Sequence, residues 1–191
     1  MCMLELGNLA SSLAPFNVSA VSVSLNANAQ EAGLVVTLEL FFAAISSLYF
    51  GTVAYKGKLL GLLGSLIVII CYYLCSIAEN IDQITTIKGF SGVGCGMLIA
   101  SGHSILASSY DPNRSYAIFT LFASITAALL IYISSTWIED GGHKYYFSNF
   151  IYVYVALTLF FFLAKKLKTT FEEHVEINKS KKGIYFLLIT A

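Results

Sequence analysis

The chain has 191 residues, with 11 basic and 11 acidic side chains and a formal net charge of zero. Only 12% of the residues are charged and 57% are hydrophobic, with a mean hydropathy of +0.75, whereas soluble domains carry about 25% charged residues. This composition excludes an ordinary soluble domain. It predicts an all-α, polytopic membrane protein, in which six segments are apolar and long enough to cross a bilayer.

The first predicted span, residues 4–25, is the least hydrophobic, but its polar residues share one face. At about 100° per residue, one side of a helix holds Asn8, Ser12, Pro15, Ser19, Ser22 and Asn26. Such a face predicts a helix that lines a water-filled path, with a kink at Pro15. The alternatives are an amphipathic surface helix or ordinary packing of serine and asparagine between helices. Asn17 lies off this face.

A short polar turn is expected at residues 30–33, and the second span, residues 33–51, carries Glu39 well inside it. A carboxylate at that depth is costly, so it should face the bundle interior, be protonated or find a partner. Glu39 is therefore a candidate proton or cation site, and a structural hydrogen bond to a neighbouring helix is an equal alternative. The third span, residues 59–77, has small residues suited to helix contacts.

The fourth span, residues 84–108, combines a cation, several glycines and a histidine. Lys88, Gly92, Gly96 and His103 fall on one stripe. In a membrane bundle this stripe predicts a helix packed against a neighbour, with its polar groups turned away from lipid. A hydrated His103 would titrate near neutral pH. We favour instead a packing hydrogen bond from His103 to a serine.

The fifth and sixth spans are expected at residues 116–138 and 145–164, separated by a polar loop at residues 139–144. The sixth is rich in aromatic residues and has no charge, which predicts a peripheral helix facing lipid. A six-helix bundle over residues 1–164 is followed by a charged cytoplasmic linker, 165–182, and by a short apolar segment, 183–191.

The distribution of basic residues predicts the orientation. With a cytoplasmic N-terminus, the cytoplasmic connections hold nine of the 11 cations: Lys56, Lys58, Arg114, Lys165, Lys166, Lys168, Lys179, Lys181 and Lys182. The opposite side holds Lys144 alone, and Lys88 lies within a span. Because cytoplasmic loops are enriched in Lys and Arg, we expect six spans with the N-terminus inside, in the inner membrane of a bacterium.

Three local patterns resemble the N-terminal six-helix half of a major facilitator superfamily transporter. The connection containing Gly51, Lys56, Gly57 and Lys58 is similar to the family's basic loop between helices two and three, with Tyr55 in place of an aspartate and one residue missing. Residues 88–96 resemble the helix-four motif, with lysine in place of the usual arginine and small residues at Gly92, Gly94 and Gly96. Pro112 and Arg114 resemble the turn after helix four. The fifth span lacks the glycine-proline signature of drug/proton antiporters.

The resemblance implies roles for particular residues. Glu39 would be the proton-coupling group. Lys88 would be an anion contact or a charge partner, either of Glu39 or of another carboxylate. Helices one and four would face a central cavity, so solute and coupling candidates are Glu39, Lys88, His103, Asn8, Asn17, Ser19 and Asn26. Gly92, Gly94 and Gly96 would serve helix packing. Gly51, Lys56, Gly57, Lys58 and Arg114 would belong to the loops that control the conformational switch.

The expected function is secondary active transport of a small solute, coupled to protons or another ion. Its partners would be the solute, protons, the lipid bilayer and a second six-helix half, supplied by a missing C-terminal part or by another chain, because residues 183–191 resemble the start of a seventh helix. The alternative is a truncated, noncatalytic membrane assembly or remnant protein without transport of its own. We expect no enzyme, cofactor, metal or nucleic-acid partner, since the sequence contains no catalytic, metal-ligating or phosphate-binding motif in its required context.

Overall fold

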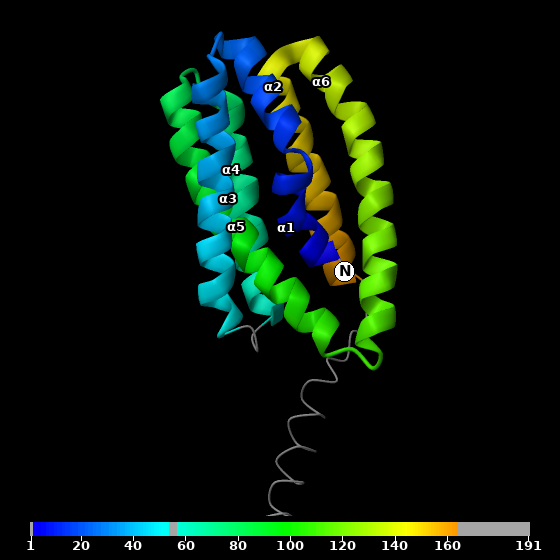
Figure 1. The fold of residues 1–191 in the computed structure, drawn as a ribbon. Coiled ribbons are helices and arrows are strands. Elements are labelled where there is room, and N and C mark those ends of the chain that lie inside the picture. The colour runs from blue at the N-terminus through cyan, green and yellow to red at the C-terminus, as the bar shows by residue number, and fades with distance from the viewer. Residues whose placement is uncertain (1, 54–56, 164–191) are drawn as a thin grey trace, which may run out of the picture.

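A computed structural model describes residues 2–53 and 57–163, and every regular element in these ranges is an α-helix (Figure 1). The helices are α1 (Cys2–Ser12), α2 (Ala14–Leu25), α3 (Ala29–Gly51), α4 (Gly57–Ile77), α5 (Ile81–Ala107) and α6 (Pro112–Leu163). The predicted linker and the predicted start of a seventh helix lie outside the described residues.

The predicted spans correspond to these helices, with two differences in how the chain is divided. Four helices in the described ranges, α3, α4, α5 and α6, are long and apolar enough to cross a membrane. The first predicted span is split into α1 and α2, which meet near Leu13. The fifth and sixth are two arms of α6. The all-α membrane bundle expected from the sequence is thus confirmed.

The arms of α6 meet at two glycines inside the segment predicted to be a polar loop. The break between the two spans lies where it was expected but is shorter, because helical structure runs up to and away from a sharp kink at Gly141 and Gly142. Gly142 adopts a positive φ of 61°, which favours glycine. The backbone N–H of His143 donates to Ser24 Oγ at 2.7 Å, and its Nε2 lies 3.0 Å from the Ala78 carbonyl oxygen. The kink is therefore docked against the ends of α2 and α4.

The connections alternate between the two ends of the bundle. The turn between α5 and α6 lies at the same end as the N-terminus and the end of α3, whereas the α2–α3, α4–α5 and Gly141–Gly142 connections lie at the other (Figure 1). This is the up-and-down path expected of a chain that crosses a bilayer repeatedly.

The second helix predicted from the sequence begins earlier than expected. Residues 30–33 are helical, because Asn28 and Glu31 form a capping box: the Glu31 N–H donates to Asn28 Oδ1 at 2.9 Å, and the Asn28 N–H donates to Glu31 Oε2 at 3.0 Å. The polar residues that suggested a turn are the start signal of α3.

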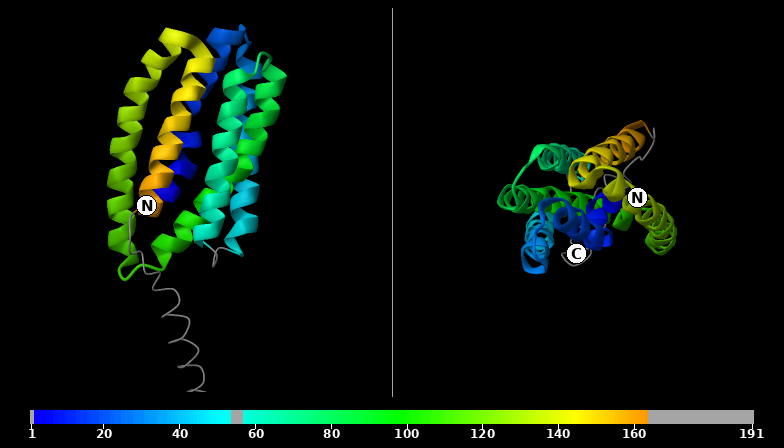
Figure 2. Two further views of the ribbon diagram at one scale, coloured as in Figure 1. Left: turned by 180° about the vertical axis from the view of Figure 1, so that it is seen from behind. Right: turned by 90° about the horizontal axis from the view of Figure 1, so that it is seen from above.

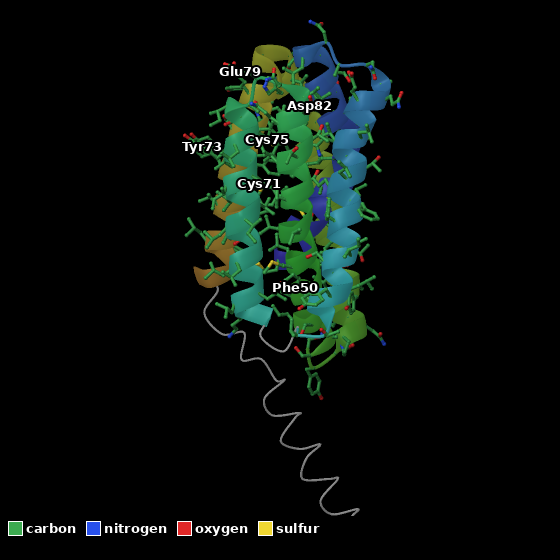
Figure 3. All side chains as sticks on the ribbon, turned by 90° about the vertical axis from the view of Figure 1, so that its left-hand side faces the viewer. Phe50, Cys71, Tyr73, Cys75, Glu79 and Asp82 are labelled. Atoms are coloured by element: carbon green, nitrogen blue, oxygen red, sulfur yellow. The ribbon has the colours of Figure 1, made fainter. Side chains whose placement is uncertain are left out.

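The centre of the bundle is α5, which packs against α3, α4 and α1. Figure 3 shows α5 between α3 and α4, with Cys71 and Cys75 on the side of α4 nearer α5 and Tyr73 pointing outward. A Cβ atom added to Gly94 would lie 2.8 Å from the Gly64 carbonyl oxygen, and the reverse distance is the same. Backbones this close require glycine at both positions.

The second arm of α6 lies in the core rather than at the periphery. Tyr146, Phe147, Phe150 and Tyr154 have no exposed surface. Three of their rings pack around Tyr72 of α4, at centroid distances of 5.6 Å for Phe147, 6.1 Å for Phe150 and 5.1 Å for Tyr154. The prediction of a lipid-facing sixth span was wrong, since its aromatic residues fill the space between α4 and the first span.

The first arm of α6 lies at the edge of the bundle (Figure 2). Phe119, Leu130 and Ile138 are buried, but Leu121, Ile125, Leu129 and Tyr132 are exposed. An arm with this much exposed apolar surface is the peripheral, lipid-facing element that the sequence analysis assigned to the other arm.

Candidate functional site

The most polar buried contact joins α3 to α5. Lys88 Nζ lies 3.1 Å and 3.2 Å from the two carboxylate oxygens of Glu39, and the Ser91 hydroxyl donates to Glu39 Oε1 at 2.9 Å. All three residues have no exposed surface. The two residues that the sequence analysis singled out separately, 49 positions apart, thus form one ion pair.

Aromatic rings close the pair on its other sides. Lys88 Nζ lies 4.0 Å from the ring centroid of Tyr72 on α4 and 5.1 Å from that of Phe147 on α6. Aromatic faces attract a cation, and the attraction strengthens when water is excluded. Side chains from α3, α4 and α6 therefore surround the ammonium group of Lys88: Glu39, Tyr72 and Phe147.

Glycines bring α3 close enough to α5 for this contact. A Cβ atom at Gly92 would collide with the Glu39 carbonyl oxygen, and one at Gly96 would lie 2.5 Å from the Ala43 carbonyl oxygen. One turn further along, the Ser46 hydroxyl donates to the Val93 carbonyl oxygen at 2.8 Å. The small residues of α5 thus set the separation at which Lys88 reaches the carboxylate of Glu39.

Unlike the buried ion pair, the polar stripe of the first span lies mostly on exposed surface. Ser12, Pro15, Ser19 and Asn26 are exposed, and Asn8 and Ser22 are half-buried. The other side of α1 and α2 is buried and mostly apolar, with Glu5 and Asn17 as its polar members. Its apolar residues include Leu6, Leu9, Leu13, Ala20 and Val21. The first span therefore presents an open polar face, and we use this name for Asn8, Ser12, Pro15, Ser19, Ser22 and Asn26.

Asn17 belongs to the buried side of the same span. It is 1% exposed, and its Oδ1 accepts a hydrogen bond of 3.2 Å from the Tyr146 hydroxyl. Its displacement from the polar stripe, which made it a weak candidate as a solute contact, places it inside the bundle, against the second arm of α6.

The amino-acid sequence matches a known protein family over almost its whole length. A family model described as Major Facilitator Superfamily matches residues 6–189. The chain belongs to the major facilitator superfamily. No curated protein and no solved structure matches it. Family members are membrane transporters, so the chain is an integral membrane protein whose general function is transport. The family predicted from the sequence is confirmed.

The loop residues that the resemblance assigned to a conformational switch lie at the end of the bundle that holds the N-terminus. Gly51 ends α3, Gly57 begins α4 and is buried, and Lys58 and Arg114 are exposed. The Arg114 backbone N–H donates to Asp111 Oδ1 at 3.1 Å, which caps the start of α6. Lys56 lies outside the described residues.

His103, the last polar member of the α5 stripe, is not sealed in the bundle. Its side chain is exposed and its Nδ1 lies 3.0 Å from the Tyr116 hydroxyl on α6. The prediction of a serine as the partner of His103 was wrong. Among the described residues, no group of three His, Cys, Asp or Glu side chains is placed to hold a metal ion.

Sequence reasoning missed the residues that enclose the ion pair. Ser91 had a usable signal, because a residue three positions after Lys88 lies on the same side of a helix. Tyr72 and Phe147 had none, since their approach to Lys88 depends on how α4 and α6 pack. Tyr72 stands next to a second tyrosine, and Phe147 lies in an aromatic-rich segment, so nothing in the sequence distinguishes either residue from its aromatic neighbours.

Proposed function

We propose that the chain is the N-terminal bundle of a secondary active transporter that moves a small solute together with protons. The observation that carries this proposal is the fully buried Glu39–Lys88 pair, held by one serine and two aromatic rings. A buried ion pair adds little net stability compared with apolar packing. Ionisable residues at membrane depth commonly mark proton or ion pathways.

Protonation of Glu39 would change the energetics of the whole bundle. A neutral carboxyl leaves the Lys88 ammonium as an uncompensated charge with no exposed surface, which costs about 3–5 kcal/mol in comparable cases. That cost favours a rearranged state in which Lys88 reaches water or another acceptor. Proton binding and the separation of α3 from α5 would therefore be linked, as coupled transport requires.

The solute would bind along the open polar face. Asn8, Ser19 and Asn26 supply hydrogen-bonding groups there without any charge, which suits a small polar solute. We propose that this face opposes a second six-helix half, as in transporters built from two repeats with a site at their interface. The proposed orientation has the N-terminus in the cytoplasm of a bacterium.

The test reconstitutes the protein, alone and together with a second six-helix half, in liposomes that enclose a pH-sensitive dye. A panel of amino acids, sugars and organic acids is added outside, and solute-evoked proton entry is recorded. At least one solute should evoke proton entry into liposomes that contain both halves. Glu39→Gln should abolish it, because the glutamine amide cannot bind and release the proton.

Glu79→Gln is the matched control, since Glu79 is exposed in the α4–α5 turn, and it should leave proton entry unchanged. Equal proton entry in Glu39→Gln and the unchanged protein would contradict the coupling role. If no solute evokes proton entry even with both halves present, the noncatalytic alternative is correct. Uptake by the chain alone would eliminate that alternative.

A further inference from the structure

A second polar cluster is buried between the first span and both arms of α6. It consists of Asn17 of α2, Ser134 of the first arm and Tyr146 of the second, each at most 1% exposed. The Tyr146 hydroxyl donates to Asn17 Oδ1, and the Ser134 hydroxyl lies beside it. We call these three residues the polar joint.

The polar joint has more hydrogen-bonding capacity than its own residues use. Asn17 Nδ2 is buried and has no hydrogen-bond partner among the described residues. Ser134 Oγ is also buried; it makes no well-aligned hydrogen bond there, and its one polar neighbour is the Tyr146 hydroxyl. Buried polar groups in proteins are paired with protein atoms or with ordered water, and a buried water typically makes about three hydrogen bonds. Asn17 Nδ2 donates, whereas a serine hydroxyl donates or accepts. Together they offer the set of partners that a water molecule needs.

The break between α1 and α2 lies a few residues before Asn17. Pro15 has no N–H, so the carbonyl of Ser11, four residues earlier, has no helical partner. The N–H groups of Phe16 and Asn17 both donate to the Leu13 carbonyl oxygen, at 3.0 Å. Ser11 and Pro15 are exposed. The break between α1 and α2 therefore leaves one carbonyl group without a helical partner, at an exposed residue of the first span.

The joint also adjoins the ion pair. Phe147, the next residue after Tyr146, has its ring 5.1 Å from Lys88 Nζ. Tyr146 lies within electrostatic range of both Lys88 and Glu39. The other titratable groups around the pair are Tyr72, Tyr154, Cys71, Cys75 and Cys95. None of these five comes from the first span, whereas Asn17 of the joint does, and Tyr154 contacts that span through the Leu6 carbonyl oxygen.

We propose that Asn17, Ser134 and Tyr146 bind water inside the bundle, and that this water carries protons between the open polar face and the Glu39–Lys88 pair. The second part rests on the proposed coupling function. Each water accepts one proton and releases another, so it is regenerated, and the last transfer forms an O–H bond on a Glu39 carboxylate oxygen while Lys88 keeps its protons.

Radiolytic hydroxyl-radical labelling with mass spectrometry tests the water site without any solute. Radicals form from water, so a buried side chain beside bound water is modified and one in a dry core is not. Tyr146 should be modified faster than Tyr72, which is 2% exposed. Ser134→Ala should slow the modification of Tyr146, whereas Ser135→Ala, an exposed neighbour, should not. Equal rates for Tyr146 and Tyr72, or no effect of Ser134→Ala, would overturn the site.

Proton entry into liposomes tests the relay, using whichever solute evokes it. Ser134→Ala and Tyr146→Phe should slow solute-evoked proton entry several-fold, and Tyr145→Phe, an exposed neighbour, should not. Unchanged proton entry in both joint variants would overturn the relay. The water site would then be judged by the labelling rates alone. If Glu39→Gln has no effect, the coupling function fails and the relay falls with it, whereas the water site is still judged by the labelling rates alone.

Discussion

Two polar stripes of similar appearance in the sequence have opposite positions in the bundle. Lys88, Gly92 and Gly96 of α5 are buried, whereas the open polar face of the first span is accessible along its length. The difference lies in the residues between the polar groups. Glycines let α3 approach until Lys88 is sealed against Glu39. Serine, asparagine and proline provide no such close contact and leave the face open.

This contrast separates two kinds of expected defect. Changes on the α5 stripe alter packing and charge inside the core, so they should reduce both stability and transport. Changes on the open polar face alter groups that are exposed or half-buried, so they should reduce transport alone. The free energy of unfolding in detergent micelles should therefore fall for variants of the α5 stripe and stay unchanged for variants of the open polar face.

Lys88→Ala should have the largest effect, destabilising the protein by about 3–5 kcal/mol, because it leaves the buried Glu39 carboxylate without a partner. Denaturant titration followed by circular dichroism measures the change. Lys144→Ala is the control, because Lys144 is exposed, and it should remain within about 0.5 kcal/mol of the unchanged protein.

The double variant Glu39→Gln, Lys88→Met separates lost packing from unpaired charge. It removes both charges and keeps side chains of similar size, so it should be more stable than Lys88→Ala, as found when buried ion pairs are replaced together. A double variant less stable than the single one would show that the pair contributes mainly through its attraction, contrary to our argument.

Gly92→Ala should destabilise the protein by about 1–3 kcal/mol, the usual cost of overpacking, because the added methyl group collides with the α3 backbone at Glu39. Gly33→Ala is the matched control on α3. No atom lies within 4 Å of a Cβ at Gly33, and alanine favours a helix by about 0.5–1 kcal/mol over glycine. Equal loss in both variants would contradict close packing as the role of Gly92.

The fold was largely predictable because apolar length and charge distribution are local properties. The positions of α3, α4 and α5, the break near Pro15 and the open polar face all follow from hydrophobic runs and helical periodicity. The capping box at Asn28 and Glu31 was equally local. The spacing of asparagine and glutamate indicates a helix start, whereas polarity alone led to the prediction of a turn at residues 30–33.

The errors concern information that a single helix does not contain. Phe147 and Tyr152 are both aromatic residues of one arm, yet Phe147 is fully buried and Tyr152 is 72% exposed. Which side of that arm meets α4 depends on the position of Tyr72, and the kink at Gly142 directs the arm there. Composition alone therefore favoured a lipid-facing helix, and the ring contacts to Lys88 could not be anticipated.

Substitution of His103 shows where the buried part of the α5 stripe ends. It is exposed and makes one neutral hydrogen-bond contact with Tyr116, so His103→Phe should cost about 0.5–1.5 kcal/mol at most. A double-mutant cycle with Tyr116→Phe measures the coupling between the two side chains directly. A destabilisation comparable to that of Lys88→Ala would assign His103 to the sealed stripe.

Ser19→Leu should have the smallest effect on stability and is the sharpest test of the open polar face. Ser19 is exposed, so the free energy of unfolding should change by no more than about 0.5 kcal/mol. Solute-evoked proton entry should nevertheless be lost, because the leucine removes a polar group and occupies the proposed path. Ser124→Leu makes the same substitution at an exposed position on the first arm of α6 and should leave proton entry intact. Equal proton entry in the two variants would mean that exposure of the first span reflects lipid contact, and the distinction between the two stripes would then be one of packing alone.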